Sequence, residues 1–152
     1  MMSSDSLSSN KSVNKLLYAF IIISLIGLAD AIWLTKSYYE GNITCTVIAG
    51  CLEVLKSSYS AIAGVPVALL GATFYTLILV IAIYYLYQNN NFSLKILKIF
   101  PTLGFLFSLY LVYLQIFVIK AICIYCMVSA GTSTILFILS LILIIKNRQI
   151  KL

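Results

Sequence analysis

The chain has 152 residues, of which 62% are hydrophobic and only 9% are charged, and its mean hydropathy is +1.09. Soluble domains typically carry about 25% charged residues, so this composition excludes a soluble enzyme domain and indicates one integral membrane domain. The net charge of +6 does not indicate nucleic acid binding, because the basic residues mostly flank apolar runs. The absence of histidine removes the commonest general base and metal ligand, and we expect no metal site.

Four apolar runs follow a polar beginning. Residues 1–14 are Ser-rich and predict a disordered cytoplasmic tail, because such a segment cannot bury a core. The runs lie at about residues 16–36, 66–87, 97–119 and 124–145, and each is long enough to cross roughly 30 Å of hydrocarbon as a helix. The sequence therefore predicts an all-α membrane protein, a four-transmembrane-helix bundle over residues 15–146, with a second cytoplasmic tail at residues 147–152.

The first run has a second interpretation. Its Leu16–Leu28 part resembles the apolar region of a signal peptide, and Ala29-Asp30-Ala31 resembles a small-residue cleavage site. The apolar run continues through Trp33, however, which favours a spanning helix.

The loop after the first helix is the longest segment without a clear membrane pattern. Residues 53–60 predict a short interfacial helix in this first extracytoplasmic loop, and Pro66 suits the first turn of the second membrane helix. Residues 88–91 predict a tight polar connection to the third.

The basic residues predict the orientation of the bundle. Seven of the ten Lys and Arg residues flank the helix ends that share a side with the two termini, and three lie on the other side. The positive-inside rule then places both termini in the cytoplasm and all four cysteines at the extracytoplasmic face of a plasma (inner) membrane. That compartment is oxidising, so disulfides form and persist there.

The four cysteines form two pairs. Cys123 and Cys126 form a Cys-x-x-Cys at the start of the fourth run, where a helix start and the nearby Lys120 are expected to lower the pKa of a thiol. Cys45 and Cys51 lie in the first loop, where a mobile pair could pass electrons to the membrane pair by disulfide exchange. Four cysteines permit three pairings, and two structural disulfides or a zinc site are the static alternatives.

Electrons passed from the loop cysteines to the Cys-x-x-Cys pair need a final acceptor. The chain has no heme, flavin, dinucleotide or iron–sulfur motif, so the acceptor is expected to be lipid-soluble, and a quinone matches the two electrons and two protons of a dithiol. Small and polar residues of the second and fourth runs could line its pocket, although ordinary close helix packing also explains them.

Several stretches carry a resemblance to the vitamin K epoxide reductase family in its bacterial form. They are Gly27-Leu28-Ala29-Asp30, Cys45 and Cys51 within the loop, Ser57-Ser58-Tyr59-Ser60, Gly64-Val65-Pro66-Val67-Ala68-Leu69-Leu70-Gly71 and Cys123-Ile124-Tyr125-Cys126. Their order, with the Cys-x-x-Cys at the fourth helix, differs from that of the quinone-linked oxidase DsbB, which carries its Cys-x-x-Cys in the first loop.

The resemblance implies a membrane thiol:quinone oxidoreductase that supports disulfide formation outside the cytoplasm. It implies that Cys45 meets a separate thioredoxin-like (DsbA-like) protein, that Cys51 exchanges with Cys123, and that Cys126 reduces a ubiquinone or menaquinone. It also implies that Ser57 lies near the quinone. Because Val67 and Ala130 replace an asparagine and a tyrosine of the vertebrate members, a plain quinone is expected rather than an epoxide.

Two other classes of function remain open at this stage. Asp30 lies inside the first apolar run, and an ionisable residue at that depth would suit a small proton-coupled transporter, although a wetted interfacial carboxylate is the simpler interpretation. The other class is a structural membrane subunit held by its disulfides.

Overall fold

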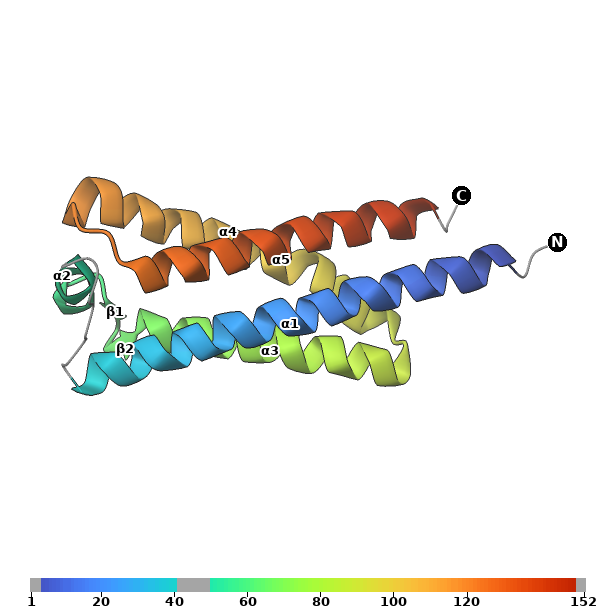
Figure 1. Ribbon diagram of the computed structural model, residues 1–152, viewed down its shortest axis with the longest axis horizontal. Helices are drawn as coiled ribbons and strands as arrows, with labels where there is room; N and C mark the ends of the chain where they lie inside the picture. The colour runs from blue at the N-terminus through green and yellow to red at the C-terminus, as the bar shows by residue number, and fades with distance from the viewer. Residues whose placement is uncertain (1–3, 41–49, 150–152) are drawn as a thin grey trace.

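A computed structural model describes residues 4–40 and 50–149. Within these residues the chain forms long helices joined by short connections, with a small hairpin in the first loop (Figure 1). The elements are α1 (Ser4–Glu40), α2 (Gly50–Lys56), β1 (Ala61–Ile62), β2 (Val65–Pro66), α3 (Val67–Gln88), α4 (Asn91–Tyr113), the π-helix η1 (Leu114–Ile119) and α5 (Ile124–Gln149).

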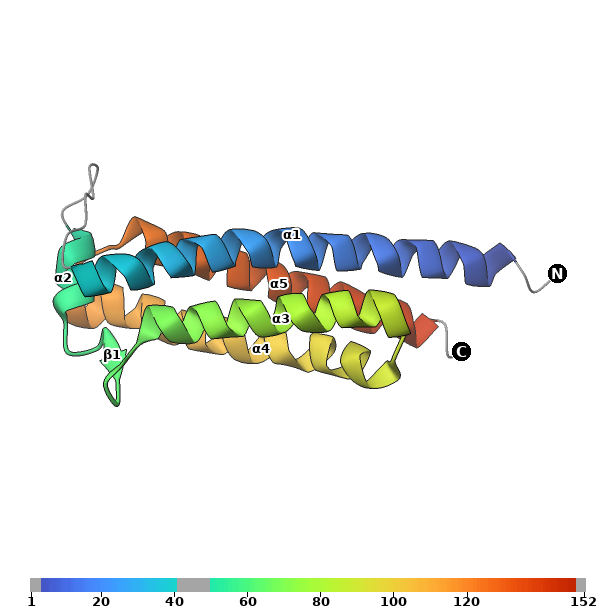
Figure 2. The ribbon, with the colours of Figure 1, turned by 90° about the horizontal axis from the view of Figure 1, so that it is seen from below.

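The four long helices form an elongated bundle. α1 packs against α3 and α5, and α4 packs against α5 and α3, so that each long helix packs mainly against two others. Figure 2 shows that α2 and the hairpin lie together at one end of the bundle, while α1 begins and α5 ends at the other end. One end of the bundle therefore carries α2 and the hairpin, and the opposite end carries the start of α1 and the end of α5.

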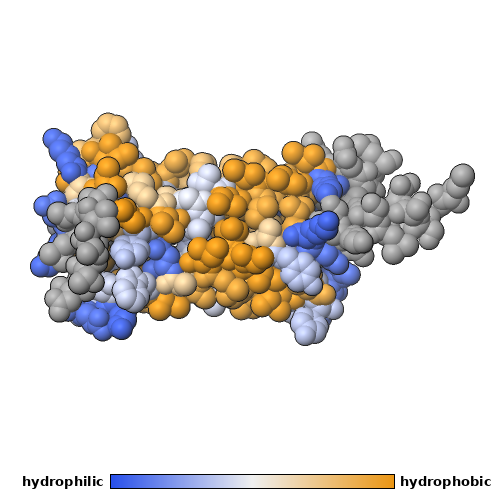
Figure 3. Space-filling view, viewed as in Figure 1, coloured by the Kyte–Doolittle hydropathy of each residue, from blue (hydrophilic) through white to orange (hydrophobic). Residues whose placement is uncertain are grey.

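The surface of the bundle matches a membrane environment. All four long segments, with η1 continuing α4, are long and apolar enough to cross a membrane. In Figure 3 an apolar belt covers the middle of the molecule, and hydrophilic residues gather towards both ends. The prediction of an all-α, four-helix membrane bundle is confirmed, and the chain is a multi-pass membrane protein.

The first helix is longer than the sequence pattern predicts. α1 begins at Ser4, so residues 4–14 are helical and the prediction of a disordered tail is wrong for them. An established helix extends readily into preceding residues, because each added residue completes one hydrogen bond without a new nucleation step.

The third membrane helix also begins earlier than predicted. α4 begins at Asn91 because the side chain of Asn90 accepts a hydrogen bond from the Phe92 N–H, at 3.1 Å, as an N-cap residue does. Asn89 closes α3 in the left-handed conformation, with a φ of 48°. The polar connection is therefore only two residues long, and Lys95 lies inside α4 rather than before it.

The loop helix and the hairpin differ from the expectation in detail. α2 spans Gly50–Lys56 rather than residues 53–60, because the Ser57 hydroxyl donates to the Val54 carbonyl at 2.7 Å and turns the chain out of the helix. The hairpin that follows was not predicted. Ala63 and Gly64 form its turn with φ values of 52° and 82°, and positive values at both positions are what a two-residue hairpin turn requires.

A close contact between α1 and α3 sets the spacing of the bundle core. Gly27 of α1 lies directly against the ring of Tyr75, so that a Cβ at Gly27 would come within 2.4 Å of a ring carbon. Tyr75 is only 1% exposed, and Leu17, Phe20 and Ile78 belong to the same buried cluster. The absence of a side chain at Gly27 therefore lets the two helices approach around the tyrosine ring.

We expect Gly27→Ala to destabilise the bundle by about 1–3 kcal/mol, because the added methyl group must displace a fully buried ring. Thermal unfolding of the purified protein in detergent micelles measures the effect. Gly131→Ala is the matched control, since a Cβ at Gly131 of α5 meets no atom within 4 Å. Equal melting temperatures for the two variants would contradict this explanation of the contact.

Candidate functional site

The start of α2 lies directly on the connection that leads into α5. A Cβ at Gly50 would come within 2.7 Å of the Ile122 carbonyl oxygen and 2.9 Å of the Ile122 nitrogen, so the two main chains are in contact. This contact brings Cys51, the next residue of α2, into one buried cluster with Cys123. Cys51 is 1% exposed and Cys123 is fully buried. Two cysteines that lie 72 positions apart in the sequence therefore meet at the end of the bundle.

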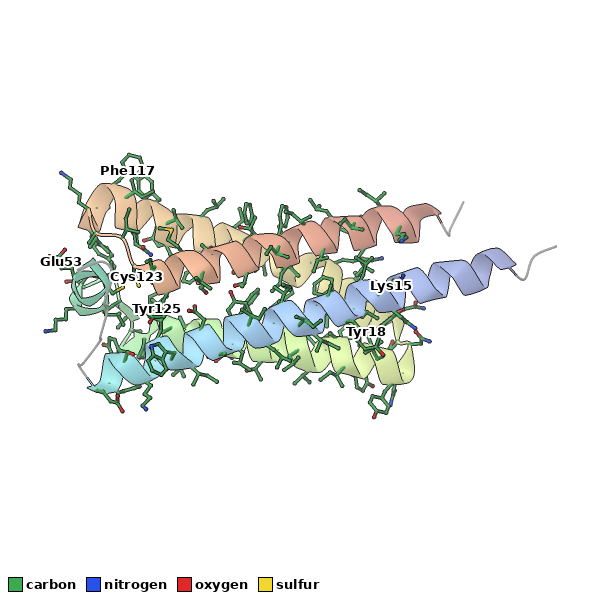
Figure 4. The ribbon with its side chains drawn as sticks, in the orientation of Figure 1. Lys15, Tyr18, Glu53, Phe117, Cys123 and Tyr125 are labelled. Carbon is green, nitrogen blue, oxygen red and sulfur yellow. The ribbon has the colours of Figure 1, made fainter. Side chains whose placement is uncertain are left out.

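Cys123 interacts with both of its cysteine neighbours. Its side chain takes part in hydrogen bonds with the side chains of Cys51 and Cys126. All three cysteines are free thiols, and Cys126 is the least buried of them. In Figure 4, Cys123 lies beside α2, at the opposite end of the bundle from Lys15. The geometry makes Cys123 the middle member of a row of three sulfurs.

The main chain around Cys123 is held by hydrogen bonds. The Met127 N–H donates to the Cys123 carbonyl at 3.0 Å, so Cys123 occupies the N-cap position of α5. The Cys123 N–H donates to Oε1 of Gln115 at 3.2 Å, and the Ala121 N–H donates to the main-chain carbonyl of the same glutamine, also at 3.2 Å. Gln115 therefore anchors the connection that carries Cys123.

The electrostatics of Cys123 differ from the prediction. The pKa of its thiol is raised, first by the side-chain hydrogen bond to Cys126 and then by burial and by the charge of Cys126. The Cys126 N–H and the Cys51 side chain act in the opposite direction, because they donate to the Cys123 sulfur. The helix start therefore does favour the thiolate, as predicted, but the neighbouring thiol and burial outweigh it, and the expectation of a lowered pKa is wrong for Cys123.

A cavity of about 280 Å³ opens beside the cysteines. This volume is at the lower end of the roughly 300–1,000 Å³ typical of small-molecule sites. Cys126 lines the cavity, whereas Cys51 and Cys123 do not. Most of the wall is apolar and comes from α1, α3, α4 and α5; its polar or sulfur-bearing members include Ser57, Tyr75, Ser108, Gln115, Cys126, Ser129 and Ser133.

The deeper part of the wall is stiffened by Tyr75. Its hydroxyl donates to the Ser129 carbonyl at 2.9 Å and lies 2.7 Å from Oγ1 of Thr132 and 3.1 Å from Oγ of Ser133. These contacts join α3 to α5 one to two turns beyond Cys126. The small and polar residues of α5 therefore serve the packing of the helices and, through Ser129 and Ser133, the wall of the cavity.

The structure brings together most of the residues that the sequence singled out. Cys51, Cys123 and Cys126 meet, and Ser57 lines the cavity while donating to Val54. Cys45 lies outside the described residues, so its predicted role stays a prediction. The described residues contain no cluster of His, Cys, Asp or Glu that could hold a metal ion.

Asp30 does not line this cavity, although the next residue, Ala31, does. Asp30 is partly buried on α1, and its Oδ2 atom is buried with no hydrogen-bond partner among the described residues. The proton-coupled transport hypothesis depends on Asp30, and the structure does not connect the carboxylate of Asp30 to the cavity.

Two residues of the site, Gln115 and Gly50, were not singled out from the sequence, whereas Tyr75 belongs to the residues of the second run that were expected as possible pocket lining. Gln115 is an amide inside an apolar run, and that alone is a signal of function or of a specific partner in a membrane segment. Gly50 carries no comparable signal, because a glycine in a loop has many ordinary explanations. Their roles depend on which residues face them across the bundle.

Comparison with known proteins gives one result that covers most of the chain. Residues 18–141 match the sequence profile of the vitamin K epoxide reductase family. No curated protein is found to match the chain.

We expect Gly50→Ala to separate Cys51 from Cys123, because the methyl group would meet main-chain atoms that cannot rotate away. In a protein that also carries Cys45→Ala and Cys126→Ala, oxidation should join Cys51 to Cys123. Gly50→Ala should slow that step by one to two orders of magnitude, since a misplacement of about 1 Å can cost about 100-fold. Mass spectrometry of the disulfide-linked peptide measures the rate. Gly131→Ala in the same background is the control, and an unchanged rate with Gly50→Ala would refute the role of the contact.

The pKa of Cys123 should respond in opposite directions to the loss of its two neighbours. Cys126→Ala removes the largest cause of the upward shift, so the midpoint pH for alkylation of Cys123 by N-ethylmaleimide should fall below that of the wild type. Adding Cys51→Ala removes a hydrogen bond that favours the thiolate, so the midpoint should rise again. Peptide mass spectrometry of the reduced proteins across pH follows Cys123 alone. A midpoint in Cys126→Ala that is no lower than in the wild type would contradict the assignment.

Proposed function

The chain belongs to the vitamin K epoxide reductase family, and from this membership and the row of three sulfurs we propose that it is a membrane thiol:quinone oxidoreductase that generates disulfides. Members of this family are membrane oxidoreductases that use quinones and work with thioredoxin-like partners. We propose that Cys45, Cys51, Cys123 and Cys126 form the electron path of this chain. The observation that carries the proposal is the position of Cys123, which is hydrogen-bonded to Cys51 on one side and Cys126 on the other.

The path proceeds by thiol–disulfide exchange. A dithiol of the partner reduces a Cys45–Cys51 disulfide and becomes a disulfide itself. The Cys51 thiolate then attacks the sulfur of Cys123 in a Cys123–Cys126 disulfide, which forms a Cys51–Cys123 bond and releases Cys126 as a thiolate. Attack of Cys45 on Cys51 restores the loop disulfide and leaves Cys123 and Cys126 reduced. Each exchange forms one sulfur–sulfur bond and breaks one.

The raised pKa of Cys123 supports this division of roles. Because the pKa of its thiol is raised, Cys123 keeps its proton and shares it with the neighbouring sulfur of Cys126. Cys126 is also the cysteine that lines the cavity. Cys126 is therefore the sulfur we expect to meet the acceptor, while the buried Cys123 faces the loop cysteine.

The cavity suits a quinone head group. Its wall is largely apolar, as the membrane-soluble ring requires, and Cys126 with Ser57 and Gln115 contributes polar groups at its edge. When bound, a quinone supplies an acceptor for the two electrons and two protons that a dithiol releases as it closes to a disulfide. Ubiquinone and menaquinone both have this chemistry, and we propose one of them as the acceptor.

The proposed electron path also indicates where a protein partner binds and how the bundle is oriented in the membrane. A thioredoxin-like (DsbA-like) protein would meet the loop that carries Cys45 at the end of the bundle where α2 and the hairpin lie. Cys123 lies at this end, opposite Lys15 (Figure 4), and Cys51 and Cys126 belong to the same cluster. With the basic flanks in the cytoplasm, this end faces the oxidising side of a plasma membrane, where new disulfides persist.

The proposal predicts that Cys126→Ala abolishes quinone reduction, because no sulfur at the cavity can then receive and pass on the electron pair. Purified protein, a reduced thioredoxin-like substrate and either ubiquinone-1 or menadione are mixed, and quinone absorbance is followed. Oxidation of the variant should instead accumulate a Cys51–Cys123 disulfide, which shows that the loop exchange survives. Gly131→Ala, which alters α5 where a Cβ meets no other atom, is the control and should retain wild-type turnover.

Turnover of Cys126→Ala at the wild-type rate would overturn the proposed path. A wild-type protein that reduces neither quinone in the presence of the thiol substrate would overturn the proposed function as a whole.

A further inference from the structure

The π-helix η1 places one polar side chain in an unusual position. Gln115 is its second residue, and its main-chain carbonyl accepts hydrogen bonds from the N–H groups of both Lys120 and Ala121. Lys120 then adopts the left-handed conformation, with a φ of 55°, and the chain turns towards α5. π-turns inside longer helices are rare and often mark functional sites. Here the turn holds Gln115, which is 3% exposed, between the end of α4 and the start of α5.

The side-chain amide of Gln115 is oriented by its partner. A main-chain N–H is a donor only, so the oxygen Oε1 must face the N–H of Cys123, and the nitrogen Nε2 must point the other way. No hydrogen bond joins Nε2 to another residue in the described part of the chain. Among the described residues only Ser24 Oγ and Asp30 Oδ2 are buried side-chain atoms without a partner, so the unpaired Nε2 of Gln115 is not sealed off and remains accessible beside the cavity that Gln115 lines.

Gln115 lines the same cavity as Cys126. Val67 and Ala130 also line it and offer no hydrogen-bonding side chain. The hydroxyl of Ser57 already donates to the Val54 carbonyl. The Nε2 group of Gln115 therefore combines three properties at this wall: it is a donor, it is unpaired, and it is held rigidly by the main chain of the neighbouring cysteine.

We propose that Nε2 of Gln115 donates a hydrogen bond to a ring carbonyl of the quinone and so holds the ring against Cys126. This inference rests on the proposed function and adds a binding residue to it. The same side chain accepts from the Cys123 N–H, so one amide connects the cysteine pair to the bound ring. A donor on the carbonyl oxygen also draws electron density towards it, which makes the ring a better acceptor for electrons from sulfur.

Infrared spectroscopy of the bound quinone tests the hydrogen bond directly. Quinone labelled with ¹³C at its ring carbonyls, as ubiquinone-1 or menadione, is bound to protein carrying Cys126→Ala, so that no turnover occurs. A hydrogen bond lowers the carbonyl stretching frequency, and we expect a lowered band that Gln115→Leu and Gln115→Met both abolish. Ser108→Ala is the matched control, because Ser108 lies on α4 and lines the same cavity. Loss of the band in Ser108→Ala but not in the Gln115 variants would overturn the inference.

Kinetics separate a contact with quinone from a purely structural role. With Cys126 intact, Gln115→Leu should raise KM for the quinone by about tenfold, as the loss of one hydrogen bond typically does. Oxidation of the reduced protein by diamide, which joins Cys123 to Cys126 without a ring carbonyl, should stay close to the wild-type rate. If both reactions slow equally, Gln115 only positions Cys123 and the inference is wrong.

The outcomes also distinguish this inference from the proposed function. A wild-type protein that reduces quinone but shows an unshifted carbonyl band refutes the role of Gln115 alone. A wild-type protein that neither binds nor reduces quinone refutes both.

Discussion

The site depends on one main-chain contact, the approach of Gly50 to Ile122. Because glycine has no side chain, the first turn of α2 lies directly on the connection between η1 and α5. This contact places Cys51 beside Cys123 in a cluster that excludes water. Val54 and Leu55 of α2 add apolar contacts in the same cluster, which includes Leu34 of α1.

A second set of interactions fixes the cysteine pair itself. The N-cap position gives Cys123 a hydrogen bond from the Cys126 N–H, and Gln115 holds its N–H from the other side. Burial and the neighbouring sulfur then raise its pKa despite the helix start. The two cysteines therefore have different surroundings, since Cys123 lies beside the loop cysteine Cys51 and Cys126 lines the cavity.

Many side-chain hydroxyls of the membrane helices are hydrogen-bonded, and among the buried side-chain atoms of the described residues only Ser24 Oγ and Asp30 Oδ2 lack a partner. In the hydrocarbon layer no water is available to hydrogen-bond an unpaired donor. Hydroxyl groups on the helices therefore bond to main-chain carbonyls one turn back or to each other. The Tyr75 hydroxyl, shared among Ser129, Thr132 and Ser133, follows this rule. The unpaired nitrogen of Gln115 differs from the unpaired atoms of Ser24 and Asp30 because Gln115 lines the cavity, whereas Ser24 and Asp30 do not.

The sequence by itself determined the membrane class, the four helices and the family, because long apolar runs and the order of the cysteines are local patterns that need no partner to be recognised. It also predicted Cys51, Cys123, Cys126 and Ser57 as site residues, which the structure places at or beside one cavity. Helix ends were less predictable: α1 and α4 begin earlier than their apolar runs, because propagation and the Asn90 cap act outside the hydrophobic pattern.

Only the tertiary structure decided which groups meet. The contact of Gly50 with Ile122, the hydrogen bond from the Tyr75 hydroxyl to α5 and the orientation of Gln115 all depend on segments that lie apart in the chain. No local sequence pattern encodes them. The pKa of Cys123 is of the same kind. A helix start predicts a lowered value, and the packing of a second thiol and the exclusion of water reverse it, because both act through distances that folding sets.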